Sequence, residues 1–342
     1  MKIVFIVDDN ATNLVTAKKA LDGVYKTFTP PSAERMFKLL EKITPDLILL
    51  DIDMPEMDGF EALSILKADE KLKHIPVIFL TANQDEKTET RGFEMGAVDF
   101  VNKPFSTPVL IKRIETHIET DLLIKRSLQS VQALHNATIK VIANMVENRD
   151  NITGGHINRT QKYLSILVDE LIRSGVYSEE TSNWNLDLLI PSAQLHDVGK
   201  VVVSDTILNK PGKLTDEEFE IIKRHSVEGE RIINEIIALT EENRFLNYSK
   251  KFAGGHHEKW NGAGYPRGLS GTDIPLEARV MAIADVYDAL VSERPYKKPF
   301  SHEKAVEIIQ NDSGTHFDPE VVGVFLKVAE EFRAVSTNDT ER

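Results

Sequence analysis

The sequence predicts two structural classes in one chain: an N-terminal α/β domain with a parallel sheet, then a long helix and an all-helical C-terminal region. Up to about residue 105, short apolar runs alternate with helical periods. Residues 106–146 contain no Gly and show no strand pattern, and beyond residue 147 helical periods are interrupted only by Gly- and Pro-rich turns. The 342 residues are enough for two or three domains.

Short apolar, branched runs indicate strands in the first hundred residues. They are Lys2–Val7, Asp46–Leu50 and Val77–Leu80, and each ends in a polar turn. Between two of them, apolar residues recur at helical spacing, at Ala33, Phe37, Leu40 and Ile43. This alternation is typical of βα units around a buried parallel sheet.

Polar side chains gather where these strands end, which is the edge at which such sheets carry their sites. Asp8, Asp9 and Asp51 would form a cluster of carboxylates that needs a cation, and hard oxygen ligands suit Mg²⁺. Thr81 and Lys103 add a hydroxyl and an amine. A carboxylate nucleophile beside Mg²⁺, with groups that bind a transferred phosphoryl group, indicates a phosphoacceptor site.

Four motifs in this region resemble the receiver domain of two-component response regulators. They are VDDN at 7–10, LLDIDMPEMDG at 49–59, LTA at 80–82 and FVNKPF at 100–105. The resemblance implies a flavodoxin-like, five-stranded sheet that a sensor histidine kinase phosphorylates at Asp51. It further implies that Asp8, Asp9 and Asp51, with the backbone carbonyl of Asp53, bind Mg²⁺. Thr81 and Lys103 would contact the phosphoryl group, and Phe100 would be the aromatic switch residue.

The linker is expected to be one helix with a weak heptad seam, because apolar positions alternate steps of four and three. The seam consists of Ile124, Leu128, Val131, His135, Thr138, Ile142 and Met145. His135 and Thr138 weaken it, so a homodimer through this helix and an ordinary amphipathic linker fit about equally well. We divide the chain into a first domain (1–120), a linker helix (121–146), a helical domain (147–335) and a flexible tail (336–342).

Five of the ten His residues and two Asp form a pattern in the helical domain. They are His156, His196, His225, His256, His257, Asp197 and Asp285. Leu186, Ile190, Ala193 and Asp197 follow helical steps, which predicts that Asp197 lies on the apolar face of a helix. Asp285 lies in a nearly continuous apolar stretch, where an unpaired carboxylate would cost several kcal/mol. Without Cys, the available ligands are imidazole and carboxylate, which suit Fe, Mn, Ni or Zn.

The seven side chains exceed what one metal takes from protein while leaving a substrate position open. A carboxylate that bridges two metals resolves this count, and Asp197, next to His196, is the natural bridge. Such a centre can generate a hydroxide nucleophile at neutral pH and clamp both oxygens of a phosphoryl displacement.

Two motifs, LHDVGK at 195–200 and HHEKWNGAGYP at 256–266, resemble the HD-GYP phosphodiesterases, a subgroup of the HD superfamily. The likeness continues in ADVYDAL at 284–290 and FDPEVV at 317–322. It implies an all-α bundle that hydrolyses cyclic di-GMP to pGpG, with further cleavage to GMP left open. The implied ligands are His156, His196, Asp197, His225, His256, His257 and Asp285. Our hypothesis places His156, His196, Asp197 and Asp285 around one metal, and Asp197, His225, His256 and His257 around the other.

The same resemblance assigns further roles. Lys200 touches the scissile phosphate and acts in catalysis with Asp197, and Asp150 orients Lys200; the remaining substrate contacts are Tyr265, Arg294 and Lys297. Some family members carry Glu where this chain has Ile152, in RDNITGGH. Because Ile cannot bind a metal, we expect two metals rather than three.

Composition narrows the remaining possibilities. The net charge of −13 disfavours direct binding of nucleic acid, and no apolar run of 18 residues predicts insertion into a membrane. The absence of Cys and of a signal peptide favours the cytoplasm. Two alternatives stay open at this point: a catalytically slow sensor that binds cyclic di-GMP, and an HD-type nucleotidase acting on another nucleotide.

Overall fold

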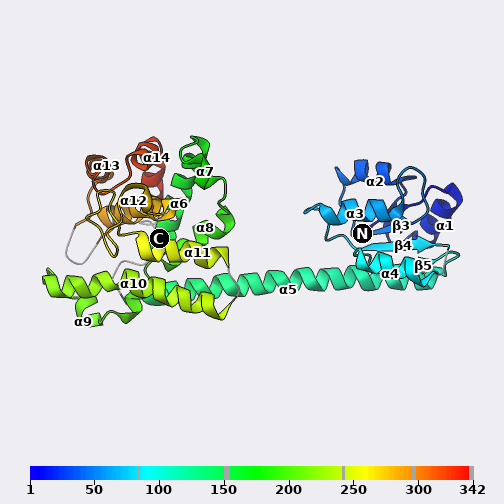
Figure 1. Cartoon of the computed structure of the whole chain (residues 1–342), viewed down its shortest axis with the longest axis horizontal. Coiled ribbons are helices and arrows are strands. Elements are labelled where there is room, and N and C mark those ends of the chain that lie inside the picture. The colour runs from blue at the N-terminus through cyan, green and yellow to red at the C-terminus, as the bar shows by residue number, and fades with distance from the viewer. Residues whose placement is uncertain (83–84, 150–154, 241–242, 294–297, 339–342) are drawn as a thin grey trace. The chain divides into compact units, whose positions relative to one another are not determined.

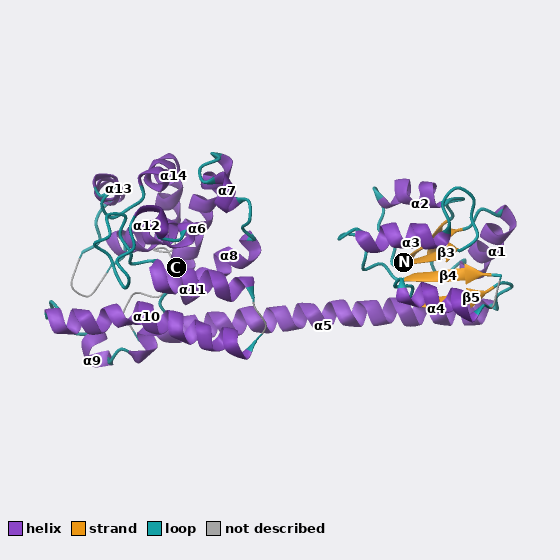
Figure 2. Cartoon of the chain, viewed as in Figure 1, coloured by secondary structure: helices purple, strands orange, loops and turns teal. Residues whose placement is uncertain are grey.

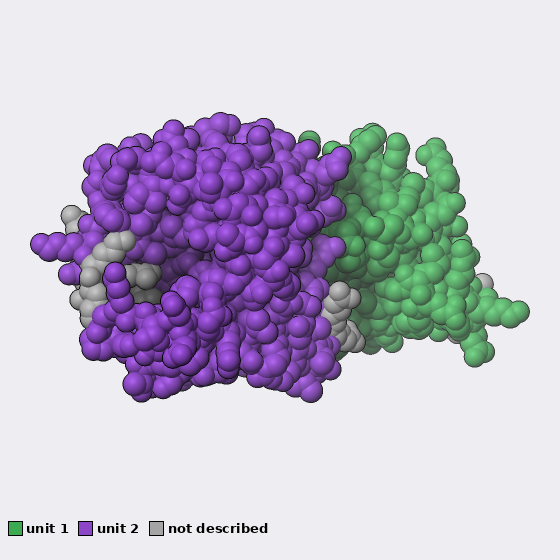
Figure 3. Space-filling model, turned by 60° about the vertical axis from the view of Figure 1, so that its left-hand side comes forward, with its two compact units in different colours: residues 1–133 green, residues 134–342 purple. Residues whose placement is uncertain are grey.

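The structure, a computed structural model, describes residues 1–82, 85–149, 155–240, 243–293 and 298–338. The chain forms two compact units, unit 1 (residues 1–133) and unit 2 (residues 134–342), which are coloured separately in Figure 3. Unit 1 holds the only named strands in the described ranges, and unit 2 is built from helices (Figure 2). This arrangement confirms the predicted order of an α/β domain, a long helix and an all-helical region.

Unit 1 is a five-stranded parallel sheet in the order β2-β1-β3-β4-β5, the flavodoxin-like arrangement that the sequence predicts. Its strands are β1 (Ile3–Val7), β2 (Lys26–Phe28), β3 (Leu47–Asp51), β4 (Val77–Thr81) and β5 (Asp99–Asn102). Each pair of neighbours runs parallel. Strands β3 and β4 extend one residue beyond the predicted ends because Asp51 still pairs with Leu80, and Thr81 with Asn102.

Helices cover both faces of this sheet (Figure 1). They are α1 (Ala11–Leu21), α2 (Ala33–Leu40), α3 (Gly59–Ala68), α4 (Glu86–Glu94) and the first part of α5 (Thr107–Glu147). Alternate strand residues point to opposite faces. Thus Val4 and Ile6 pack with α1 and α5, whereas Phe5 and Val7 pack with α2 and α3.

Helix α5 is continuous from Thr107 to Glu147, so the predicted linker helix is the extension of the last helix of unit 1 rather than a separate element. Its first turns bury Leu110 and Ile114 under the sheet of unit 1. Its last turns bury Ile139 in a cluster with Leu195 and Val198 of unit 2. The stretch between these two buried ends has no Gly to interrupt the helix.

Unit 2 is a helical bundle around a buried core of aromatic side chains that includes Tyr163, Phe252, Tyr287, Phe325 and Phe332. Its longer helices are α6 (His156–Arg173), α10 (Asp216–Leu239), α11 (Arg244–Gly255), α12 (Leu276–Val291), α13 (His302–Asn311) and α14 (Pro319–Asn338). Its short elements are α7 (Ser178–Thr181), α8 (Leu186–Ser192), η1 (Ala193–Leu195), η2 (Val198–Val202), α9 (Asp205–Leu208) and η3 (Gly271–Asp273).

Two local expectations need correction. The predicted helix over 186–197 ends at Ser192 and tightens into the 3₁₀ turns η1 and η2, so Asp197 lies between them and not on an α-helical face. Pro191, near the end of α8, lacks the N–H that continues the helical hydrogen-bond pattern. The tail predicted from Ser336 continues α14 to Asn338, with the hydroxyls of Ser336 and Thr337 donating to the carbonyl of Arg333.

Within the part of the chain that the structure describes, no helix combines the length and the apolar character needed to cross a membrane.

Candidate metal centre and phosphoacceptor site

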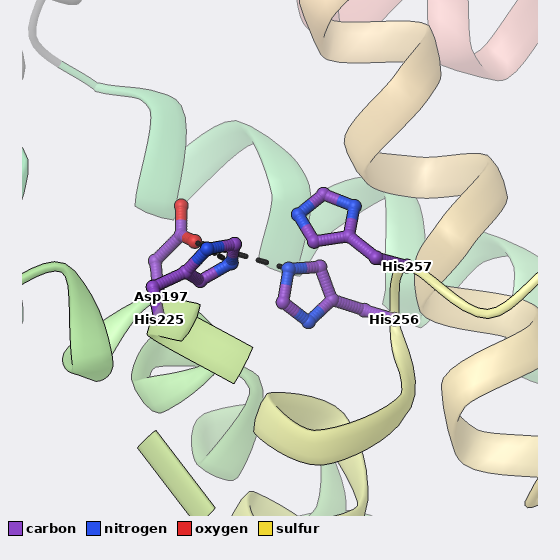
Figure 4. Close-up of side chains that lie close together, drawn as sticks. All are labelled: Asp197, His225, His256 and His257. Carbon is purple, nitrogen blue, oxygen red and sulfur yellow. Dashed lines mark ion pairs between the residues drawn. The ribbon is translucent and has the colours of Figure 1, made fainter. Parts of the chain in front are cut away.

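Four side chains converge in unit 2, as Figure 4 shows: Asp197, His225, His256 and His257. Their ligand atoms all lie within 4.8 Å of one another. His225 comes from α10, His256 and His257 follow the end of α11, and Asp197 lies between η1 and η2. A second cluster of His156, His196 and Asp285 meets the same distance limit.

The Asp197 carboxylate faces both clusters. One oxygen, Oδ2, lies 3.3 Å from Nε2 of His196, and the other, Oδ1, lies 3.4 Å from Nε2 of His225 and 3.8 Å from Nε2 of His256. This is the position that a bridging carboxylate requires. The structure therefore groups the same residues that the sequence assigns to two metals, while their role as ligands stays a prediction.

Backbone carbonyls orient the imidazole rings of these clusters. Nδ1 of His196 lies 2.8 Å from the carbonyl oxygen of Ala193, that of His225 lies 2.6 Å from Ile222, and that of His256 lies 2.8 Å from Phe252. A carbonyl can only accept, so each ring carries its proton on Nδ1 and presents the lone pair of Nε2 to the cluster. Second hydrogen bonds of this kind are usual for metal-binding imidazoles.

Several buried atoms in this region have no hydrogen-bond partner among the described residues. They include Nε2 of His196, Nε2 of His256 and Oδ1 of Asp197. An unsatisfied buried acceptor costs about 1–3 kcal/mol, and a charged one costs more. Both imidazole nitrogens face the Asp197 carboxylate, His196 at Oδ2 and His256 at Oδ1. A divalent cation in each cluster would satisfy these acceptors, so the residues fit metals.

The protonation states of most of these side chains suit a metal. His196 is the exception without a metal, because burial would lower its pKa but the neighbouring Asp197 carboxylate outweighs burial and raises it. Burial, followed by the charge of His196, lowers the pKa of His256 to about 3, and burial next to His256 holds the pKa of His257 well below its usual range. Burial alone would raise the pKa of Asp197, but Lys200 and His196 outweigh it and hold that pKa well below its usual value. Neutral imidazole and ionised carboxylate are the forms that bind metals.

His156 is held by a carboxylate rather than by the backbone. Its Nδ1 lies 2.8 Å from Oδ2 of Asp288, a buried residue on α12. Arg159, one turn further along α6, donates to both oxygens of Asp288, at 2.6 and 3.0 Å. These contacts fix the plane of the Asp288 carboxylate and, through it, the direction of the His156 ring.

Lys200 extends from η2 toward the metal clusters, with Nζ 2.8 Å from Oδ2 of Asp197. The segment that carries it is held from outside by Arg149, whose guanidinium donates to the carbonyls of Val201 at 2.8 Å and Val203 at 3.0 Å. Arg149 also binds the Asp205 carboxylate at 2.8 Å. Arg149 thus fixes the backbone that presents the Lys200 ammonium.

Tyr265 lies beside the cluster of Asp197, His225, His256 and His257, with its ring centroid 4.7 Å from that of His257. Its loop is held by the buried carboxylate of Glu258, which accepts from the backbone N–H groups of Arg267 at 2.8 Å and Leu269 at 3.0 Å. The other positions that the sequence assigns to this site, Asp150, Ile152, Arg294 and Lys297, lie outside the described residues.

In unit 1, the carboxylates of Asp8, Asp9 and Asp51 come within 4.8 Å of one another at the end of the sheet. Lys103 reaches both Asp8, at 2.7 Å, and Asp51, at 2.8 Å, and its bond to Pro104 is cis. Burial raises the pKa of Asp51 despite the neighbouring Lys103 ammonium. A divalent cation would offset this cluster of charges, so these oxygen ligands fit Mg²⁺.

The remaining predicted residues of unit 1 lie on β4, on β5 and in the segment after β3. Thr81 is buried at the end of β4, whereas the side chain of Asp53 is exposed, which is compatible with a contribution from its backbone alone. Phe100 is buried, with its ring 5.3 Å from Phe79 and 5.0 Å from Phe93 of α4.

Sequence reasoning missed several residues that shape the metal centre. Asp288 and Arg159 each lie three positions after a predicted ligand on a helix, a spacing that places both pairs on a common face and could have identified them. Arg149 gives no such signal, because its partners lie more than 50 positions away.

Comparison with known proteins supports the predicted family of each of the two domains. Residues 4–115 match the model of the response regulator receiver domain, and residues 140–321 match the model of the HD domain. A probable cyclic di-GMP phosphodiesterase of Vibrio cholerae is 40% identical over 338 residues, which cover 94% of this chain and 77% of the relative.

Two further relatives extend the comparison. The cyclic di-GMP phosphodiesterase response regulator RpfG of Xanthomonas campestris is 34% identical, with 82% of this chain and 75% of RpfG covered. A 3′3′-cGAMP-specific phosphodiesterase of Vibrio cholerae is 39% identical over 57% of this chain and 35% of its own length. The chain therefore belongs to the HD-domain family, and within it to the response regulators that join a receiver domain to the HD domain.

Proposed function

We propose that this protein is a response regulator in which phosphorylation of Asp51 controls the hydrolysis of cyclic di-GMP to pGpG. The observation that carries the proposal is the position of the Asp197 carboxylate, with one oxygen toward each of two His/Asp clusters and with Lys200 alongside. The relatives that match nearly the whole chain are named for this activity. The receiver domain implies a histidine kinase as the phosphodonor.

Bound metals and the chain's own residues would share the reaction. Bound divalent metals would activate water at neutral pH and neutralise the oxygens of the phosphodiester. The imidazole rings that backbone carbonyls anchor would keep the metal ligands in place during the reaction. Because the pKa values of His256 and His257 are low, protons do not compete with a metal for these rings. As water attacks phosphorus and the P–O3′ bond breaks, Lys200 stabilises the developing charge and gives a proton to O3′.

The number and identity of the metals are part of the proposal. The two clusters of described residues supply imidazole and carboxylate only, a set that suits Fe, Mn, Ni or Zn. With Ile152 at the position where some relatives have Glu, we propose two metals for each chain. Elemental analysis of protein purified without oxygen tests this number, and three equivalents would contradict it. If a third metal serves the second cleavage, pGpG should accumulate.

We also propose that the chain forms a homodimer through α5. Exposed apolar side chains lie at the predicted seam positions Ile124, Leu128, Val131, Ile142 and Met145. His135, at the middle of the seam, instead contacts Phe245 of the same chain, with ring centroids 5.5 Å apart. Sedimentation equilibrium should give a dimer, and Leu128→Glu together with Val131→Glu should give a monomer.

The direct test of the function is chromatography of the products formed from cyclic di-GMP by the metal-loaded protein. We expect pGpG as the first product. Turnover of 3′3′-cGAMP in parallel reports the choice between cyclic dinucleotides, and hydrolysis of a mononucleotide instead would favour an HD-type nucleotidase. Binding of cyclic di-GMP without any product would favour a sensor. A cytoplasmic location follows from this proposal, because both the kinase domain and this substrate are found there.

A further inference from the structure

We infer that Phe219 and Lys223, on the first turns of α10, bind the substrate outside the metal centre: the exposed Phe219 ring stacks with a purine base, and the Lys223 ammonium attracts the anionic backbone. Among the described residues, their ring and charge contacts are with each other, with Tyr265 and with Glu220. The inference rests on the proposed function, because it requires a substrate that carries both a base and a phosphodiester.

A continuous run of rings leads from the metal centre to these residues. The ring of His257 lies 4.7 Å from that of Tyr265, and the ring of Tyr265 lies 6.4 Å from that of Phe219, nearly perpendicular to it at 83°. Phe219 is therefore the outermost ring of the series. A substrate whose phosphodiester occupies the metal centre can extend a base along this surface.

The exposure of Phe219 is not explained by packing within the described structure. It is 44% exposed, although most apolar side chains around it on α10 are at least partly buried. This exposed aromatic surface next to the reaction centre is available to a ligand, with the Lys223 ammonium 4.9 Å from the ring centroid. Bases stack on such faces, and replacing an aromatic side chain by Ala typically costs about 1–3 kcal/mol for each base.

Lys223 gives this surface its charge. Its Nζ lies 4.9 Å from the centroid of Phe219 and 5.7 Å from that of Tyr265, so the ammonium is shared between the two rings. Its partner is the exposed carboxylate of Glu220, at 2.5 Å. Exposed ion pairs are weak, so an anionic ligand can replace Glu220 at little cost. In a chain with a net charge of −13, a cation beside the site favours the approach of a phosphodiester.

The test measures KM and kcat for cyclic di-GMP on the metal-loaded full chain. Phe219→Ala is expected to raise KM about tenfold, which corresponds to about 1.4 kcal/mol, with kcat and metal content unchanged. Phe219→Leu keeps an apolar side chain of similar size but has no aromatic face, so it should behave like Ala, whereas Phe219→Trp should restore KM. Leu239→Ala, an exposed apolar position at the far end of α10, is the matched control.

Lys223→Gln should also raise KM and should make KM less sensitive to salt, because screening then acts on one charge fewer. Arg224→Gln removes an exposed charge from the neighbouring position and controls for net charge. An unchanged KM in Phe219→Ala, an equal effect of Leu and Trp, or complete loss of turnover with metals retained would each overturn the inference. A parent protein that does not hydrolyse cyclic di-GMP would instead overturn the proposed function.

Discussion

Replacing Asp288 by Asn should weaken metal binding at the His156 cluster about 10- to 100-fold, the range found when the partner of a metal-binding His is changed. The Asp288 carboxylate is 1% exposed and accepts the Nδ1 proton of His156 at 2.8 Å. Asn keeps the shape of this acceptor but removes its charge, so the imidazole becomes a weaker base and its direction is less fixed. The loss corresponds to about 1.4–2.7 kcal/mol of binding free energy.

The same substitution leaves Arg159 without its buried counter-charge, which is expected to cost about 3–5 kcal/mol of stability. Asp318→Asn is the matched control, because Asp318 is equally buried and pairs with Arg279 at 2.7 Å, outside both clusters. Competition with a chromophoric chelator measures metal affinity, and urea unfolding measures stability. Parent affinity in Asp288→Asn, or an equal loss of affinity in Asp318→Asn, would refute the orienting role of Asp288.

Four further outcomes are expected. Lys200→Met should keep both metals and lower kcat about 10²- to 10³-fold, as measured by product chromatography; parent kcat would remove its electrostatic role. Asp197→Ala should abolish metal loading and hydrolysis together, and retained turnover would contradict the bridge. Asp51→Asn should keep basal activity and lose only the change caused by a small-molecule phosphodonor. In metal-free protein, the free energy of unfolding should fall as the pH is lowered from about 6.5 to 3. In this range His256 takes up a proton in the unfolded chain but not in the folded chain, where its pKa is about 3. Equal urea midpoints at about pH 7 and pH 5 would contradict this.

Three strands of unit 1 could be predicted because their signals are local, whereas β2 and β5 followed only from the resemblance to receiver domains. Strands such as Val77–Leu80 are short, apolar and followed at once by polar residues, so both their existence and their functional edge are visible in the sequence. The bundle of unit 2 was less accessible in detail. Helical periodicity continues through Ile190 and Ala193, but the chain tightens into 3₁₀ turns after Pro191. That change brings Asp197 between the clusters, and periodicity alone cannot reveal it.

The ligand types of the metal centre could be predicted from chemistry, whereas the contacts that orient them could not. His and Asp without Cys already restrict the metal. His225 is anchored by the backbone carbonyl of Ile222, three positions earlier. Every residue type has such a carbonyl, so the identity of residue 222 does not reveal this contact. The contact of His156 with Asp288 joins positions 132 apart, so only the packing of α6 against α12 creates it.

The end of α5 forms part of the wall of the metal centre, and this restricts how regulation can work. Val146 and Glu147 line a small cavity together with His196 and Lys200, and the Glu147 carboxylate accepts the backbone N–H of His156 at 2.8 Å. Two residues further on, Arg149 holds the backbone that presents Lys200. Since α5 is a single helix that begins in unit 1, a rotation or shift of its last turns would change the backbone at one candidate ligand and the support of Lys200 at once. In the proposed function, phosphorylation of Asp51 would therefore act on catalysis through the last turns of α5.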